Sequence, residues 1–167
     1  MAKKNRHLRG DINDITLPVH GNIVVEKGDF ILEFKDDNSI VAATSADGYG
    51  YPASSCRLNT APFFVELFAG VAMSGSISGV TNDILVATSG QFRYPLESST
   101  NTTLKAGMIV SGVTGSSATS ITAQQVVCKI IGTENPIGRC VLTESSATNC
   151  DFELLTRYSG VSYFDIV

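Results

Sequence analysis

The hydrophobic periodicity of the chain constrains its fold more than any other feature. No segment longer than ten residues sustains the 3.6-residue apolar repeat of an amphipathic helix. Short runs rich in Val, Ile, Phe and Thr instead alternate with clusters of Gly, Ser, Asn and Asp, at a spacing of roughly 8–12 residues. This pattern is typical of an all-β chain, and it predicts a small β-barrel or β-sandwich domain.

Individual runs show the alternation expected of half-buried strands. In GNIVVEKGDFILEF, the residues Phe30, Leu32 and Phe34 fall on one face and charged residues fall on the other. In QFRYPL, Phe92 and Tyr94 point one way and Gln91 and Arg93 the other, and Pro95 is expected to end the ladder because it has no N–H to donate. Further strands are predicted in IVAATS, PFFVELFAGVAMSG, DILVAT, AGMIVSGV, QQVVCKIIG, IGRCVLTES, CDFELLTR and VSYFDIV.

Two of these strands begin in the same way. VEKGDFI and LKAGMIV each place a lysine shortly before a glycine and then continue with apolar residues. Gly28 and Gly107 would permit a tight turn at each point, and the lysine would keep that turn solvated. We interpret both stretches as corners of a β framework. The repeated pattern is too short to establish an internal duplication.

Charge is distributed unevenly along the chain. The net charge is −4, yet the first nine residues carry Lys3, Lys4, Arg6 and Arg9 without an acid, so the remainder carries −8. We therefore expect an extended basic N-terminal arm, residues 1–19, followed by a β-rich domain, residues 20–167. The arm is either an element that orders against an acidic partner or a solvated, flexible terminus. Its ITLPV segment is a candidate to pair with a neighbouring sheet edge.

Composition argues against several classes of protein. The body of the chain is acidic, whereas a nucleic-acid-binding domain is usually basic over a whole face. A hydrophobic content of 43% argues against global disorder. No stretch approaches the roughly 18–20 apolar residues of a membrane-spanning helix, and the N-terminus lacks the apolar segment of a secretory signal.

No motif indicates catalysis, a cofactor or a metal site. The two histidines, His7 and His20, lack the neighbours of a zinc site. The segment GSISG places Ile77 where a nucleophilic serine would stand. The segment DGYGYP has no predicted helix after it to help bind a phosphate. We expect no enzyme activity, no cofactor and no bound metal.

Four cysteines are present, Cys56, Cys128, Cys140 and Cys150, and no two form a C-x-x-C pair. We expect reduced cysteines, most of them packed as small core residues. A disulfide such as Cys140–Cys150 has no secretory feature to support it.

The insertion ADGYGYPASS carries two tyrosines, Tyr49 and Tyr51, among glycines. They are interpreted as anchors of a surface loop, with stacking on a sugar or packing on a partner as the alternatives.

Several motifs in order carry a likeness to a known family: EKGDFI, AGVA, ILVATSGQFRYPL, KAGMIV, NPIGRCVL and FELL. In this order they resemble the phage capsid decoration (cement) proteins of the DUF2190 family, which share their role and part of their fold with lambda-type head-stabilising proteins. The likeness covers about residues 20–157. Met108 stands where the family has an acid, and neither ADGYGYPASS nor the basic arm belongs to the family pattern.

The resemblance implies a β-rich homotrimer that binds the major capsid protein on the outer surface of an icosahedral head. Such a protein is made in the host cytoplasm, acts in the virion and stabilises the shell against the pressure of packaged DNA. It binds neither nucleic acid nor membrane. The basic arm is expected to contact the capsid through Lys3, Lys4, Arg6, Arg9, Ile15 and Leu17, with Tyr49 and Tyr51 as trimer or capsid contacts.

Two alternatives from other classes remain open. One is a β-sandwich binding module of a phage tail or fibre that recognises glycans through its tyrosine loop. The other is a small hydrolase whose Ser or His site carries no recognisable motif.

Overall fold

The computed structural model describes residues 6–9, 12–33, 48–55, 66–97, 103–114, 121–129 and 136–159. Within these ranges the chain is all-β, which confirms the predicted fold class. The strands predicted in IVAATS and VSYFDIV lie outside the described residues. A short 3-10 helix, η1, spans Ala53–Ser55, and the strands are β1 Arg6–Arg9, β2 Asp14–Val19, β3 Phe30–Glu33, β4 Gly50–Pro52, β5 Phe68–Ala72, β6 Asn82–Ala87, β7 Gln91–Pro95, β8 Ile109–Thr114, β9 Ile121–Lys129, β10 Pro136–Cys140 and β11 Asn149–Leu154.

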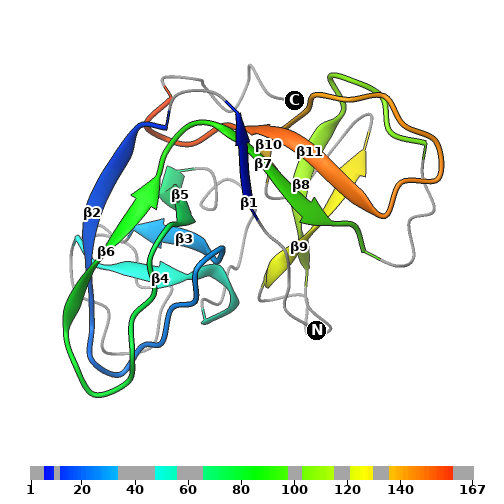
Figure 1. The fold of residues 1–167 in the computed structure, drawn as a ribbon. Coiled ribbons are helices and arrows are strands. Elements are labelled where there is room, and N and C mark those ends of the chain that lie inside the picture. The colour runs from blue at the N-terminus through cyan, green and yellow to red at the C-terminus, as the bar shows by residue number, and fades with distance from the viewer. Residues whose placement is uncertain are drawn as a thin grey trace.

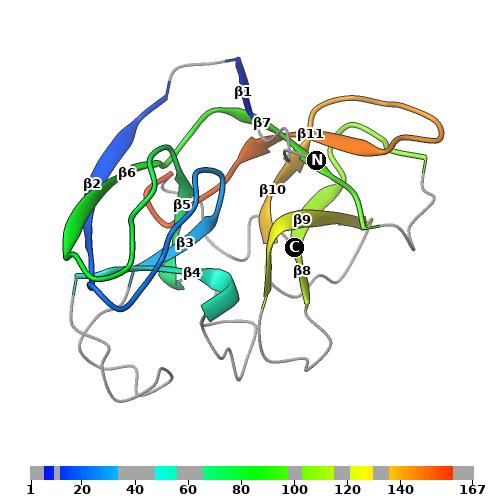
Figure 2. The ribbon, with the colours of Figure 1, turned by 60° about the horizontal axis from the view of Figure 1, so that its bottom comes forward.

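The strands form two antiparallel sheets that lie side by side (Figure 1). The first sheet has the order β2-β6-β5-β3-β4, and the second has the order β1-β7-β11-β10-β8-β9. The second sheet curls so strongly that its two sides meet. Leu96, the residue after β7, forms a parallel bridge with Val126 of β9. Figure 2 shows β9 meeting the end of β7 in this way.

The two sheets repeat one topology. We define the first unit as β2 to β6, residues 14–87, and the second unit as β7 to β11, residues 91–154. If the strands of each unit are numbered in chain order, both sheets have the spatial order 1-5-4-2-3, and β1 is an additional strand outside β7. In the first unit, too, the third strand approaches the first, because a Cβ placed at Gly50 would lie 3.3 Å from the Leu17 Cβ.

The turn before β3 explains why Gly28 is followed by Asp29 in the stretch VEKGDFI. The Asp29 amide donates to the Glu26 carbonyl at 3.0 Å, and the Asp29 carboxylate accepts from the Glu26 amide at 2.8 Å. Gly28 has a φ of 95°, a conformation that only glycine adopts readily. Its amide donates to Ala72 O at the end of β5 at 2.8 Å.

The turn before β8 has the same construction. The Met108 amide donates to the Lys105 carbonyl at 3.1 Å, and Gly107 has a φ of 87°. The Gly107 amide donates to Cys140 O at the end of β10 at 2.8 Å. The thioether of Met108 lies 3.1 Å from the Lys105 amide, where the first turn has the Asp29 carboxylate. The two similar stretches of sequence therefore occupy equivalent positions in the two units.

A second glycine recurs in the fourth strand of each unit. A Cβ at Gly70 would lie 1.9 Å from the Ala87 carbonyl oxygen, and a Cβ at Gly138 would lie 2.2 Å from the Glu153 carbonyl oxygen. Each glycine is paired with the second strand of its unit next to a β-bulge. Both units thus require a residue without a side chain where two strands cross most closely.

The interior of each unit is built from equivalent positions. In the first unit these are all aliphatic and form a separate cluster: Leu17, Val19, Val25, Ile31, Ala69, Ala72, Ile84 and Val86. By the strand registers they are equivalent to buried residues of the second unit, in the same order: Tyr94, Leu96, Leu104, Val110, Ile137, Cys140, Cys150 and Phe152. The chain therefore contains an internal duplication at the level of the fold, which its sequence alone does not establish.

The two units share one large core. Phe30 of the first unit stacks on Tyr94 of the second with ring centroids 4.9 Å apart, and it also packs edge-on against Phe68. The buried Tyr94 hydroxyl donates to Gly28 O at 2.5 Å. The outer face of the first sheet is thus buried against the second unit, so neither unit has a complete core by itself.

Candidate interaction surface

The predicted arm divides into two strands. Lys3 and Lys4 lie outside the described residues, whereas Arg6 and Arg9 are the ends of β1. In the register of β1 with β7, Arg6 stands opposite Arg93 and Arg9 opposite Gln91. The basic segment is therefore placed at the edge of the second sheet.

The boundary of the arm at residue 19 is wrong, because Asp14–Val19 is β2 and pairs along its length with β6. Leu17 is only 5% exposed inside the first unit, so its side chain is not available to a capsid. Ile15 is half-buried against the same cluster. The alternation of Ile15, Leu17 and Val19 was the signal for this strand, but it is short and adjoins a charged segment.

The tyrosine pair does not form a surface platform. Tyr51 belongs to β4 and is only 2% exposed in the main core. Tyr49 is half-buried against that core, with its ring centroid 6.3 Å from that of His20. The interpretation of Tyr51 as an exposed contact is wrong, because the GYP segment is a short buried strand instead of a loop.

One edge of β2 is open. The Thr88 amide donates to Asn13 O at 2.7 Å, so by the alternation of an antiparallel ladder the backbone groups of residues 15, 17 and 19 also face β6. The backbone groups of Asp14 and Thr16 then face away, as does the nitrogen of Pro18, which has no hydrogen to donate. Among the described residues, no strand pairs with this edge at Asp14–Thr16.

In the second unit, the equivalent edge of β7 pairs with an additional strand. Leu154 N donates to Gly90 O at 2.9 Å, equivalent to the bond between Thr88 and Asn13, so β7 has the same alternation as β2. The outward groups of Gln91 and Arg93 face β1, which pairs there in antiparallel fashion. The edge of β7 thus carries an added strand at the positions where the edge of β2 carries none.

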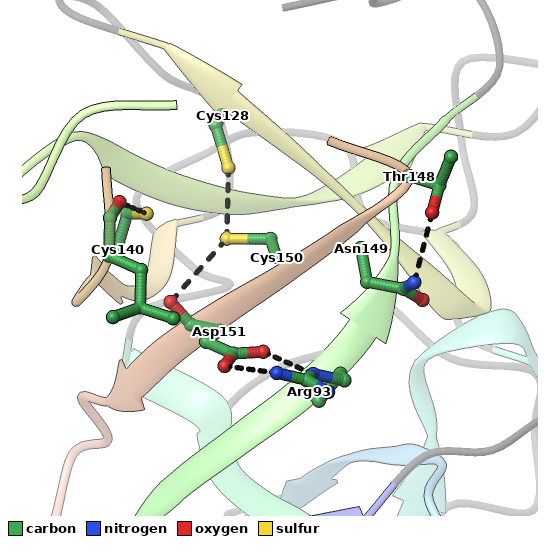
Figure 3. A network of polar contacts seen from close by, with 8 residues as sticks. Arg93, Cys128, Cys140, Thr148, Asn149, Cys150 and Asp151 are labelled. Atoms are coloured by element: carbon green, nitrogen blue, oxygen red, sulfur yellow. Dashed lines mark hydrogen bonds and ion pairs between the residues drawn. The ribbon is translucent and has the colours of Figure 1, made fainter. Parts of the chain in front are cut away.

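The residues beside the two edges differ in charge. Arg93 forms a bidentate ion pair with Asp151, with Nε–Oδ1 at 2.5 Å and Nη2–Oδ2 at 2.6 Å (Figure 3). This hydrogen-bonded pairing raises the pKa of Arg93. At the equivalent positions the first unit has Thr16 and Leu85, which pair in the β2–β6 register, and Leu85 is 40% exposed. The open edge is therefore flanked by an apolar side chain instead of an ion pair.

Three more apolar side chains are exposed at one end of the first unit, and we call them the apolar tip. They are Val24, Ile77 and Val80, which are 51%, 71% and 50% exposed. Their two loops are joined by a hydrogen bond from Gly79 N to Gly21 O and lie together at the lower left of Figure 1. At the positions equivalent to Val24 and Ile77 the second unit has Thr103 and Ser145, and its loop 141–148 exposes Leu142 elsewhere.

No group of three or more His, Cys, Asp or Glu side chains in the described ranges is arranged to hold a metal ion. The described part of the chain also has no helix long and apolar enough to cross a membrane. Comparison with protein-family models, curated proteins and solved structures finds no significant match in any of the three.

Proposed function

We propose that this chain is a capsid decoration (cement) protein that binds the outer surface of an icosahedral phage head as a homotrimer. Its partners are then the major capsid protein and two further copies of itself. The observation that carries the proposal is the asymmetry of the two units. Among the described residues, the first unit leaves open the strand edge that β1 covers in the second, and it exposes Val24 and Ile77 where the second has Thr103 and Ser145.

The open edge of β2 and the apolar tip suit a structural contact. An extended segment of a capsid protein can add to a strand edge through main-chain hydrogen bonds, and neighbouring apolar side chains then give specificity. Burial of the apolar tip supplies free energy in proportion to the area removed from water. The first unit therefore offers both components of a strand-addition site.

Such binding stabilises a shell by linkage. A protein that binds the expanded shell but not its separated subunits adds stability that grows with its affinity and concentration. Three copies joined in a trimer bind with avidity, so a weak single contact suffices. Neither step requires catalysis. The alternative of a glycan-binding module rests on the tyrosine pair, and no described feature favours it now that Tyr51 is part of the core.

Binding to expanded heads of the virus that encodes this chain tests the proposal. Thr16→Pro removes an outward N–H and leaves the β2–β6 ladder intact, so it should abolish strand addition while the chain stays folded. Ile77→Ser with Val80→Ser should weaken each single contact about tenfold. Leu142→Ser is the control, because Leu142 is 46% exposed, close to the 50% of Val80, but belongs to the second unit.

Two outcomes would contradict the proposal. One is that the wild type, the folded Thr16→Pro variant and the variant with Ile77→Ser and Val80→Ser all bind expanded heads with the same affinity. The other is a sedimentation coefficient of a monomer at all accessible concentrations, because a decoration protein of this kind acts as a trimer.

A further inference from the structure

Three of the four cysteines meet inside the second unit (Figure 3). Cys128 comes from β9, Cys140 from the end of β10 and Cys150 from β11, and each is at most 3% exposed. The sulfur atoms of Cys128 and Cys150 lie 3.2 Å apart, which is closer than an ordinary non-bonded contact of about 3.5–4.0 Å between carbon atoms. The Cys140 thiol instead donates to Leu142 O at 3.1 Å.

The first unit shows that this fold does not need sulfur at these positions. The strand registers make Pro52 equivalent to Cys128, Ala72 to Cys140 and Ile84 to Cys150. All three residues of the first unit are buried and apolar. The same interior is therefore packed once without any thiol and once with three, so packing alone does not account for the cluster.

We propose that Cys128 and Cys150 are an oxidisable pair that forms a disulfide across the interior of the second unit. The two strands that carry them are not neighbours, because β10 and β8 lie between β11 and β9 in the sheet. A bond between them would fix β9 directly to β11 and reinforce the curl that the Leu96–Val126 bridge closes. The sulfur atoms need to approach from 3.2 Å to about 2.05 Å.

The oxidant is a small-molecule disulfide such as oxidised glutathione. A protein thiolate attacks one of its sulfur atoms, a mixed disulfide forms, and one small thiol leaves. A second protein thiol then attacks the mixed disulfide and releases the second small thiol. Two protein thiols lose two hydrogens, and one small disulfide becomes two thiols.

The third thiol favours the first step. The pKa of Cys140 is lowered to about 7, mainly by a hydrogen bond with Cys150, whereas hydrogen bonding with Cys128 and burial raise the pKa of Cys150. An opening that releases β9 alone leaves Cys140 beside Cys150, so Cys140 can supply the thiolate and exchange can pass the bond on to the closer pair. Because the sulfur atoms are buried, this chemistry takes place while the chain folds or β9 opens.

The test refolds the full chain, carrying Cys56→Ala, from denaturant in buffers of graded oxidised and reduced glutathione. Non-reducing peptide mapping should find Cys128 linked to Cys150, with the mass lowered by two hydrogens and Cys140 free to alkylation. The oxidised protein should melt roughly 5–10 °C above the reduced protein, because the bond closes a loop of some twenty residues.

Three variants sharpen the result. Cys140→Ala, which installs the residue of the first unit, should keep the disulfide and the redox-dependent melting temperature. Cys128→Ala and Cys150→Ala should each lose both. The proposal is overturned if the wild-type pattern shows Cys140 in the dominant bond, if no intramolecular disulfide forms under the most oxidising buffer, or if oxidation lowers the melting temperature.

Discussion

At the scale of single residues, the duplication is visible at the few positions where only glycine fits. Gly28 and Gly107 recur because both turns need a positive φ, and Gly70 and Gly138 recur because a carbonyl oxygen occupies the space of a side chain. The interior positions require only apolar volume, so they share little identity. The sequence therefore predicted the turns correctly but could not reveal that they are equivalent.

Gly70→Ala should lower the free energy of unfolding by roughly 2–4 kcal/mol, because its Cβ would overlap the backbone carbonyl of Ala87. Gly79→Ala is the control, since Gly79 has a φ of 93° but nothing within 4 Å of a Cβ, and it should cost only about 1–2 kcal/mol. Urea unfolding measures both values. Equal losses would mean that the close approach of β5 and β6 relaxes freely.

Burial raises the pKa of Tyr94 far above its usual value of about 10, because an ionised phenol would lie inside the shared core. Below pH 10 the phenol is neutral in both states, so it gives no pH dependence. Above pH 10 only the unfolded chain loses this proton, and stability should fall by about 1.4 kcal/mol per pH unit.

Urea unfolding between pH 8 and pH 11 measures this slope. Tyr94→Phe should remove the part of this slope that begins near pH 10. The parts that remain come from Cys150, whose pKa is raised by its hydrogen bond with Cys128 and by burial, and from Tyr158, whose pKa is raised to about 12 by partial burial and its hydrogen bond to Glu33. Tyr94→Phe should also lose about 1–3 kcal/mol at pH 7, because Gly28 O then lacks its buried donor. An unchanged slope in this variant would contradict the assignment.

At the scale of elements, β1 and β2 are the strands whose environment the sequence described least well. The alternation of β2 spans only six residues and follows a basic segment, so the sequence places it in an extended arm whose ITLPV segment is only a candidate to pair with a sheet edge. β4 was missed because its glycine and proline are usual in loops. In both cases long-range pairing overrides a local signal.

Removal of residues 1–9 should replace the short edge strand β1, whose pairing with β7 is interrupted by a bulge, by the longer strand β7 at the edge of the second sheet. Such edges pair with one another, so we expect concentration-dependent association in sedimentation velocity experiments. Removal of residues 1–5 is the matched control, because it takes away Lys3 and Lys4 but keeps β1. Identical sedimentation of the two truncated chains would show that β1 does not protect β7.

At the scale of the whole molecule, the two units share one main core, and we expect them to fold as one cooperative structure. Phe30 stacks on Tyr94, and the main core draws on both units. The sequence predicted an all-β domain, and this is confirmed. It did not predict two units, because the duplication is visible in the strand order and registers and not in sequence similarity between the units.

Separate fragments test this cooperativity. Residues 12–89 and residues 90–159 should each lack a near-ultraviolet circular dichroism signal from packed tyrosines, because the face each buries against the other is exposed. An equimolar mixture should regain that signal, since the shared core re-forms. A native-like signal in either fragment alone would show that the units fold independently.

The matching first strands also affect how the chain reaches this structure. β2 and β7 share the pattern of alternating apolar residues with a proline at the same register, in DITLPV and QFRYPL. During folding each can therefore align with either β6 or β11, and the wrong choice produces a kinetic trap with reasonable local pairing but a mismatched core. A duplicated fold therefore brings an ambiguity of partner choice, which the Arg93–Asp151 ion pair between β7 and β11 and the contacts between the units resolve.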